Sequence, residues 1–543
     1  MRGLRSCIPL KIFLCAVVIM SLSGCGTPGR ERLQADMRHM APQEFRDATL
    51  RLIRAFATEK VSGQAFVPEK LKIRGRWQVE VTLYNNGDVK GYARGTDALF
   101  SRAVKKTVYA LCRAAFMDIA MIEKGCFWVN VRDDAGFSQT FIEFKGKGLE
   151  LADDVTACRR LTKELIKEKV EAGKLYLLSH MDKEKHAFYK RYDVVNDDYT
   201  TRLRTIYTAS ALYSLLKISD TEYDPQVEHA IPLIAEFLLS MQSTDEKTNG
   251  AFCYSYYTDT DKKEQRFVSG TAAKTIFTLL ELSRRISESR YLASGRAAGD
   301  WLLSMQNDDA SVKPQAAYHG NVLVYEQRNS FLYNGQALSA LSRLYTVTQE
   351  KKYYDAAEKI ARLFKKSSRE SGFFVGDDYR RENVVSTSWV VMALLDYYKV
   401  SNDEDAWDVL TRCADELLKR QCNDPFDILD YGRFTGTRAG SGNGWINEVL
   451  NELYVFSKEH DKNMEQRERY KEAILKVTRW LIQNTYSPEN TYFLKNPEKA
   501  FGGLIRNSDE ESVRTDAVCH GLNSYITMLG YLEDGELLNV PEN

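Results

Sequence analysis

One repeating unit is visible in residues 250–283, GAFCYSYYTDTDKKEQRFVSGTAAKTIFTLLELS. It begins with a Gly-x-Phe turn and aromatic residues, passes through a polar segment and ends in an apolar helical pattern. The segment FLLSMQ (237–242) precedes it, and WLLSMQ (301–306) repeats that segment almost letter for letter. YLLS (176–179) begins a similar unit. Self-similarity at about 60 residues is typical of repeat proteins, so we interpret each unit as one helical hairpin.

The apolar periodicity predicts six such hairpins after residue 154. Six helices rich in Ala, Ser, Leu and Tyr are expected at 202–218, 267–282, 330–347, 386–400, 444–457 and 513–532. A more charged helix with one apolar stripe precedes each of them, at 157–178, 226–241, 290–305, 353–366, 406–420 and 465–483. Six alternating pairs favour a closed (α/α)6 toroid, and an open α-solenoid is the alternative.

The connections between these helices are unequal in length. Links from an inner to an outer helix are short, as at 347–353, whereas links from an outer to an inner helix are long, as at 242–267 and 421–444. Long loops on a helical scaffold usually carry function. They also place the amino termini of the inner helices around one mouth, where the helix dipoles favour an anionic ligand such as a uronate.

The 543 residues exceed one ordinary core, so two or more domains are expected. The fold class is mainly α, with an (α/α)6 toroid at 154–535 preceded by a small α+β domain at 42–153. In that domain we expect helices at 42–59 and 98–116 and strands at 77–83, 89–93, 127–131 and 141–144, with a hairpin turn at 85–88. Residues 26–41 form a tether and residues 536–543 a tail.

Residues 81–118 resemble the AMMECR1 family. VTLYNNGDVKGYARG (81–95) is followed by a helical pattern ending AAFMD (114–118), as in that family's strand, Gly-containing turn and helix. The resemblance implies a fold rather than an activity. The family's Arg-Gly-Cys-Ile-Gly motif has KGYARG (90–95) in its place, so the cysteine is absent and no chemistry is carried over.

The first 25 residues form a signal. Arg2, Arg5 and Lys11 precede an apolar run at 12–22, which is too short to span a bilayer. The run ends in LSGC (22–25), which resembles the bacterial lipoprotein signal, in which the cysteine receives the lipid; an ordinary secretory signal is the alternative. We therefore expect a periplasm-facing protein anchored through Cys25, and Gly26 favours the outer membrane.

Composition excludes some classes of function. Lys plus Arg and Asp plus Glu number 75 each, so no basic excess suggests nucleic acid. Ten cysteines spread over the chain without a CxxC do not indicate a disulfide framework, although a Cys413–Cys422 bridge stays open. The seven histidines lack metal-ligand spacing, so we predict no metal and no cofactor.

Candidate site residues fall on the predicted long loops and the helix starts that follow them. Carboxyls and a histidine could serve as acid and base, whereas tyrosine faces stack on sugars and arginine binds carboxylates in a fork. His520 lies one helical turn after Asp516, on the same face. Alternatively, the tyrosines seal the end of the barrel, the Asp pairs cap helices, Glu326 compensates a helix dipole, and Arg514 and Asp516 form a structural pair. The candidate acid–base residues are Asp198, Glu326, Asp378, Asp516 and His520. The candidate binding residues are Tyr199, Arg202, Tyr256, Arg266, Tyr325, Arg328 and Arg514.

Residues 334–357, from NGQALSAL to KKYYDAA, resemble the six-hairpin glycosidase-like superfamily and, more narrowly, the C-terminal domain of D-glucuronyl C5-epimerases. That family relies on paired tyrosines late in the chain; near Arg514 only Tyr525 stands, so these tyrosines are not carried over. The resemblance implies a hydrolase, lyase or epimerase acting on an acidic glycan. A non-catalytic lipoprotein that binds a glycan or a protein partner is the alternative.

Overall fold

The computed structural model describes residues 42–63, 74–85, 88–115, 117–118, 121–122, 125–133, 138–142, 161–371, 375–423, 431–437, 439–487, 496–507 and 510–533. Cys25, the predicted tether and the predicted tail lie outside these ranges. The chain divides into two compact units, residues 1–158 and 159–543. Within the described ranges, no helix combines the length and the apolar composition needed to cross a bilayer.

Among its described residues, the first unit contains a four-stranded antiparallel sheet and the helices α3 and α4. The sheet order is β2-β1-β3-β4. Its elements are α3 (Pro42–Ser62), β1 (Arg74–Asn85), β2 (Asp88–Leu99), α4 (Phe100–Ala114), β3 (Cys126–Arg132) and β4 (Ser138–Ile142). Phe100 packs against Phe45 and Trp77, with ring centroids 5.7 and 5.1 Å away, and joins both helices to the sheet. The six helices and strands expected here are confirmed, and β2 is longer than predicted.

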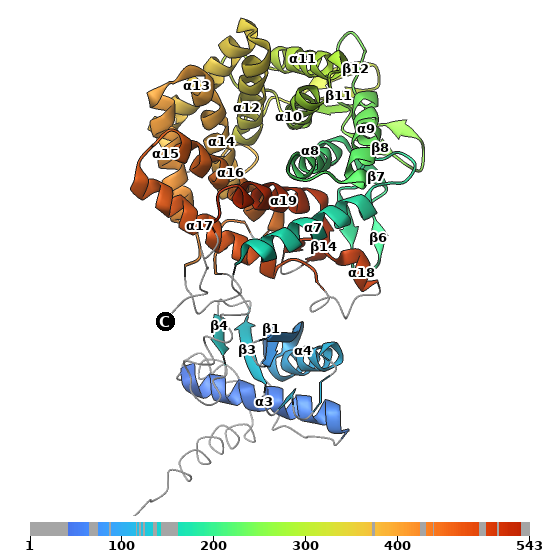
Figure 1. Ribbon diagram of the computed structural model, residues 1–543, viewed down its shortest axis with the longest axis vertical. Helices are drawn as coiled ribbons and strands as arrows, with labels where there is room; N and C mark the ends of the chain where they lie inside the picture. Colours follow the sequence, from blue (N-terminus) through green and yellow to red (C-terminus); the bar gives the residue numbers. More distant parts are fainter. Residues whose placement is uncertain are drawn as a thin grey trace, which may run out of the picture. The chain divides into compact units, whose positions relative to one another are not determined.

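The second unit is an (α/α)6 toroid (Figure 1). Each inner helix contacts the next, and α19 contacts α8, so the ring is closed and the solenoid alternative is excluded. The inner helices are α8 (Thr205–Thr221), α10 (Ser269–Arg285), α12 (Phe331–Thr348), α14 (Val384–Ser401), α16 (Gly440–Glu459) and α19 (Thr515–Leu529). The outer helices are α7 (Lys163–His180), α9 (Pro225–Ser240), α11 (Ser289–Ser304), α13 (Lys351–Ser371), α15 (Glu404–Leu418) and α17 (Met464–Gln483).

Local hydrogen bonds set where these helices begin and end. Helix α7 begins later than predicted because the Thr162 hydroxyl accepts from the Leu165 N–H at 3.1 Å and caps it. Helix α9 begins at Asp224, whose carboxylate accepts from the Gln226 and Val227 N–H groups. Helices α12 and α14 end at Gln349 and Asn402, which adopt φ of 58° and 53° and turn the chain directly into the next outer helix.

Three inner helices begin later than predicted because the preceding residues form short strands. The end of the toroid where the inner helices begin is called the loop end below. There, the short strands of one long loop pair with strands of the next long loop. The strands here are β5 (Arg191–Asp193), β6 (Asp198–Tyr199), β7 (Arg202–Arg204), β8 (Ser255–Tyr257), β9 (Lys262–Lys263), β10 (Arg266–Val268), β11 (Gln315–His319), β12 (Val322–Tyr325), β13 (Ile505–Asn507) and β14 (Glu510–Arg514). Strand β7 pairs with β8, β10 with β11, and β14 with β5, which joins the last loop to the first. A four-residue helix, α18 (Pro497–Ala500), lies in the last loop.

The repeated glutamine of the LLSMQ motif joins consecutive outer helices. Gln242 follows α9 and donates to the carbonyls of Gly250 at 3.0 Å and of Ser294, in α11, at 2.9 Å. Gln421 repeats this contact after α15, donating to Gly432 and to Ala473, in α17. The glutamine therefore recurs because α9, α11 and α15 make the same connection to the next outer helix.

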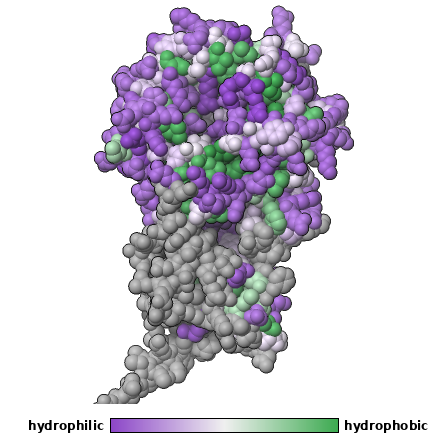
Figure 2. Space-filling view, viewed as in Figure 1, coloured by the Kyte–Doolittle hydropathy of each residue, from purple (hydrophilic) through white to green (hydrophobic). Residues whose placement is uncertain are grey.

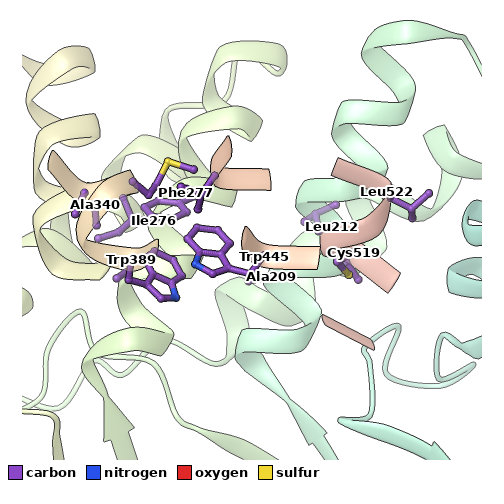
Figure 3. Close-up of a cluster of buried hydrophobic side chains, with 14 of the residues drawn as sticks. Ala209, Leu212, Ile276, Phe277, Ala340, Trp389, Trp445, Cys519 and Leu522 are labelled. Atoms are coloured by element: carbon purple, nitrogen blue, oxygen red, sulfur yellow. The ribbon is translucent and has the colours of Figure 1, made fainter. Parts of the chain in front are cut away.

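The core of the toroid lies between the two rings of helices and along the inner faces. Small residues such as Ala209 and Ala340 occur on the inner helices beside large rings from Phe277, Trp389 and Trp445 (Figure 3). The face of the toroid visible in Figure 2 is mostly hydrophilic, with scattered apolar residues. Neither Cys413 nor Cys422 is in a disulfide, so the bridge that the sequence left open does not form.

Candidate functional site

A buried acid–base pair lies on the inner face of the ring, between α16 and α19. His520 Nδ1 is 2.7 Å from Glu448 Oε2, and the Asn523 amide donates to Glu448 Oε1 at 3.1 Å. The Ser214 hydroxyl of α8 in turn donates to Asn523 Oδ1 at 2.9 Å. Gly444 allows this approach, because a Cβ there would lie 3.0 Å from His520 Cβ. Three inner helices therefore hold the Glu448 carboxylate in place.

The charge state of Glu448 determines which atom of His520 carries a proton. Burial opposes ionisation, but the hydrogen bond and charge of His520 and the charges of Lys274 and Lys217 outweigh it and hold the pKa of Glu448 well below its usual range. An ionised carboxylate only accepts hydrogen bonds, so His520 Nδ1 is the donor. In the neutral form of the ring the other nitrogen, Nε2, is the proton acceptor, and His520 is part of the lining of the inner cavity.

Lys274 of α10 projects into the same space. Its ammonium nitrogen lies 5.1 Å from the centroid of the Trp445 ring and 5.4 Å from that of Trp389. The two indoles stack at 3.9 Å, as Figure 3 shows. Among the described residues, Lys274 has no hydrogen-bond or ion-pair partner. Burial lowers its pKa, and the charge of Glu448 opposes that shift.

The space between these side chains is small. The inner cavity has a volume of about 20 Å³, and its lining includes Ser210, Tyr213, Lys274, Arg343, Glu448 and His520. That volume holds about one water molecule. A larger ligand group reaches His520 Nε2 only if a side chain moves. Lys274 is the side chain best suited to move, because it is long and has no hydrogen-bond or ion-pair partner among the described residues.

An arginine stands one to three residues before each inner helix, which places these arginines at the loop end. They are Arg204, Arg266, Arg328, Arg381, Arg438 and Arg514, of which Arg438 lies outside the described residues. Arg204 and Arg266 lie on the Tyr254 ring, with guanidinium carbons 4.6 and 4.0 Å from its centroid. Both also pair with Glu264, at 3.7 and 3.2 Å, so two cations share one carboxylate.

The predicted residues Arg514 and Asp516 form a forked ion pair at the start of α19. Arg514 Nε is 3.0 Å from Asp516 Oδ1, and a second guanidinium nitrogen is 2.6 Å from Oδ2. Arg514 also donates to the Tyr207 hydroxyl at 3.0 Å. Nearby Lys190 has no side-chain partner among the described residues. Burial and the charges of Arg514 and Arg204 lower the pKa of Lys190.

Glu326 and Arg328 form a second pair at the loop end. Arg328 Nε donates to Glu326 Oε1 at 2.6 Å, and its guanidinium lies over the Tyr379 ring at 3.9 Å. Burial opposes ionisation of Glu326, but the neighbouring Tyr379 and Arg328 lower its pKa overall. Tyr325 is exposed at the end of β12, with Lys313 over its ring.

The other predicted residues lie away from His520. Asp198 is exposed on β6 and accepts from the Tyr199 N–H at 2.7 Å, while Tyr199 packs among other aromatic rings. Asp378 is exposed and accepts from the Asn329 N–H at 2.8 Å. Two further residues, Arg202 over the Tyr257 ring and Tyr256 against Phe237 and Asp261, pack within the loops. The two aspartates thus bind backbone N–H groups, but neither caps the helix that follows it, because the N-cap residues of α8 and α14 are Arg204 and Asn383.

Two central residues were not among the predicted site residues. Glu448 lies 72 positions before His520, so no local spacing connects them. Lys274 lies in an apolar helix pattern, TAAKTIFTLL (271–280). The only feature of the sequence that could have identified it is a single lysine among apolar residues. Within the described ranges, no group of three or more His, Cys, Asp or Glu side chains is placed to hold a metal ion.

Comparisons with known proteins show what this architecture resembles. No family model and no curated protein matches the chain. The structure is similar to cellobiose 2-epimerase from Bacillus thermoamylovorans, at 12% identity and a TM-score of 0.55, over 68% of this chain and 99% of that chain. It is similar to a D-mannose isomerase, at 13% and 0.53, over 68% and 98%.

A third similar structure is an inactive variant of an α-1,6-mannanase from Salegentibacter in complex with α-1,6-mannotriose, at 12% identity and a TM-score of 0.50, over 67% of this chain and 99% of that chain. At these identities the likeness concerns the fold. The chain shares the six-hairpin glycosidase-like (α/α)6 fold with carbohydrate-active enzymes.

Proposed function

We propose that this protein is a carbohydrate-active enzyme that binds an acidic glycan at the loop end and moves a proton on it through His520. The observation that carries the proposal is the Glu448–His520 pair on the inner face of the ring, at 2.7 Å. The fold supports it, since the similar solved structures include a sugar epimerase, a sugar isomerase and a mannanase.

The geometry favours proton transfer at carbon over hydrolysis by two carboxyls. Ionised Glu448 fixes the proton on His520 Nδ1 and stabilises the imidazolium that forms when Nε2 takes a second proton. A carbon next to a carbonyl, or next to a carboxylate that a bound cation neutralises, is acidic enough for such a base, and return of a proton to the opposite face of that carbon inverts its configuration. Hydrolysis needs a carboxylic acid as proton donor. Asp516 and Glu326, however, each form an ion pair with an arginine, and the lowered pKa of Glu326 disfavours it as that donor.

The charges at the loop end support an acidic substrate. Arg204 and Arg266 share the single carboxylate of Glu264, and Lys190 has no side-chain partner among the described residues. These four side chains therefore carry three positive charges and one negative charge. The Tyr254 ring between the two arginines adds an aromatic surface. A uronate carboxylate suits this combination because guanidinium groups bind carboxylates through paired hydrogen bonds.

One observation favours a second candidate, a non-catalytic glycan-binding protein. The inner cavity of about 20 Å³ has no room for a sugar ring beside His520. In that case the arginines and tyrosines at the loop end hold the glycan, and Glu448 and His520 only join α16 to α19.

The experiment is to incubate the protein in D2O with uronate-containing oligosaccharides and, separately, with neutral oligosaccharides, and to follow the sugars by NMR. We expect solvent deuterium to replace one carbon-bound hydrogen of the acidic sugar, and His520→Gln to abolish this exchange. His229→Gln, the same change on the exposed surface of α9, is the matched control and should keep it.

Binding without exchange by the unmodified protein would support the second candidate instead. A new reducing end without deuterium at carbon would show hydrolysis and contradict the role of His520 as a carbon base. Binding of neutral and acidic sugars with equal affinity would contradict the acidic substrate.

We further propose that the chain is a lipoprotein anchored in the cell envelope through Cys25, on the strength of the LSGC sequence at 22–25. Cys25→Ser should abolish incorporation of radiolabelled palmitate and release the protein from the membrane fraction. The AMMECR1-like assignment of residues 42–153 stays a prediction that rests on the sequence of 81–118.

A further inference from the structure

A second, larger cavity lies at the opposite end of the toroid, where the inner helices end. This rear cavity has a volume of about 800 Å³, and its lining includes Tyr213, Lys217, Phe277, Arg343, Lys399 and Glu452. Four residues, Tyr213, Phe277, Arg343 and Glu452, line both the rear cavity and the inner cavity beside His520. The two spaces are therefore separated by single side chains.

Two ammonium groups in the rear cavity share one carboxylate. Lys217 Nζ lies 3.6 Å from Glu452 Oε1, and Lys399 Nζ lies 3.9 Å from Glu452 Oε2. Both distances exceed those of hydrogen bonds, and neither lysine has an acceptor elsewhere among the described residues. Six ammonium N–H donors thus lack a protein acceptor in one partly enclosed space.

Arg343 adds further donors to this cavity. Its Nε donates to Asp396 at 2.8 Å, and one terminal nitrogen lies 3.8 Å from the Met392 sulfur. The other terminal nitrogen has no partner among the described residues. Lys217, Lys399 and Arg343 therefore stand around Glu452 and Asp396, whereas the other charged residues of the lining are paired, Arg284 with Glu281 and Glu288 with Arg290.

Compensation of helix dipoles does not account for all three cations. The carboxyl ends of the inner helices carry partial negative charge, which basic residues in the last turn offset. Lys399 is such a residue. Lys217 lies four residues before the end of α8 at Thr221, and Arg343 lies five residues before the end of α12 at Thr348, so both are set back from the helix ends.

We propose that the rear cavity is a second ligand site, which binds a small organic oxyanion of about monosaccharide size, a carboxylate or a phosphate monoester. The anionic group accepts hydrogen bonds from Lys217, Lys399 and Arg343. The volume lies in the range of small-molecule sites. Leu280, Leu292 and Val347 supply an apolar wall for the body of the ligand. The site does not depend on the function proposed for the loop end.

An anion in the rear cavity also acts on the inner cavity. It contacts Arg343 and stands beside Glu452, and both side chains line the space next to His520. Binding at the rear therefore changes the charges around the Glu448–His520 pair. This places the rear site in position to modulate any reaction at His520.

The test is isothermal titration calorimetry of the full chain with glucuronate, glucose 6-phosphate and, as the neutral control, glucose. We expect saturable binding of one or both anions and no binding of glucose. Lys217→Met should weaken anion binding by about tenfold or more, since it removes a charged donor from the site. Lys351→Met, the same change at an exposed lysine of α13, should leave affinity unchanged.

A second variant covers the case in which Lys217→Met fails to fold. Val347 is 50% exposed at the rim of the rear cavity, so Val347→Glu adds a negative charge with little change in packing. It should weaken anion binding several-fold. Lys190→Met tests the loop end separately and should leave rear binding unchanged.

The proposal is overturned if neither anion binds at millimolar concentration. It is equally overturned if Lys190→Met abolishes binding while Lys217→Met and Val347→Glu leave it intact, because the anion then occupies the loop end. Failure of deuterium exchange at His520 with retained rear binding would reject the proposed function alone.

Discussion

Glu448 illustrates why the interior of the toroid is organised around polar pairs. A buried carboxylate is costly unless charges and hydrogen bonds replace its hydration. His520 and Asn523 provide those bonds, and they lie 72 and 75 positions after Glu448 in the sequence. The same arrangement leaves His520 Nε2 as the reactive nitrogen. Stability and chemistry therefore depend on the same contacts at this residue.

His180 provides a prediction for stability against pH. Burial lowers the pKa of His180 to about 4, against about 6.5 in an unfolded chain. Between these values the unfolded state binds the proton more tightly, so stability falls as the pH drops from 6.5 to 4. We expect His180→Gln to remove up to about 3 kcal/mol of that pH-dependent loss, measured by urea unfolding at several pH values.

The matched control for this prediction is His229→Gln, on the exposed surface of α9. It should keep the pH dependence of the unmodified protein. An unchanged slope in His180→Gln would show that His180 does not contribute to acid unfolding.

At the scale of the element, the repeated glycines of the long loops explain part of the sequence repeat. Gly250, Gly432 and Gly502 adopt φ of 87°, 92° and 80°. A Cβ on each would lie 2.0 to 2.1 Å from a carbonyl oxygen of the next outer helix, at Ala297, Lys476 and Ala172. The backbone of each of these loops thus packs against the outer helix of the following hairpin. The last loop, at Gly502, packs against α7 of the first hairpin.

Gly250→Ala should therefore destabilise the protein strongly. The added Cβ collides with the Ala297 carbonyl, which belongs to helix backbone and cannot rotate away, so we expect a loss of about 3 kcal/mol or more in the free energy of unfolding. Urea unfolding followed by far-ultraviolet circular dichroism measures it.

Gly320→Ala separates the collision from the backbone conformation. Gly320 has a φ of 62° but open space around its Cβ position, so only the left-handed conformation is penalised, by about 1 kcal/mol. Equal losses in the two variants would refute the collision argument.

For the whole molecule, ring closure makes the six hairpins mutually dependent. Helix α19 packs against α8 and α16, and strand β14 pairs with β5 of the first loop. A solenoid loses one terminal repeat at small cost to the rest, because each repeat contacts only its neighbours. A toroid that loses its last hairpin exposes two inner faces and strips Glu448 of both partners.

Truncation after residue 496 tests this difference. We expect the shortened chain, which lacks α19, to lose the cooperative unfolding transition of the toroid, as measured by circular dichroism in urea. A chain ending at residue 533 keeps every described element and should unfold like the full protein. A folded, cooperative product of the first truncation would mean that the ring does not unfold as one unit.

The helices were predictable because their signals are local. Apolar periodicity places a helix wherever one face must be buried, and the motif at 237–242 and 301–306 recurs because each outer helix makes the same contact. The first residues of α8, α10 and α19 were misplaced by two or three positions. There, strand pairing with a distant loop competes with the helical pattern, and no local signal reports such pairing.

The candidate site was only partly predictable. Arg514, Asp516 and His520 were identified, and the structure places them at or near the start of α19. The expected relation between them differs, however, because Asp516 pairs with Arg514 while His520 pairs with Glu448. Their i, i+4 spacing shows that two residues share a face, but it does not show which neighbouring helix that face meets.

The sequence by itself determined the number of hairpins, the order of inner and outer helices and the side on which the long loops lie. These follow from periodicity and spacing, which act within a few residues. Only the tertiary structure decided that the ring closes, that Glu448, Lys274 and His520 converge from three helices, and that a charged cavity opens at the rear. Such convergence depends on the packing of helices across the ring, and contacts between residues this distant in sequence leave no pattern in either segment alone.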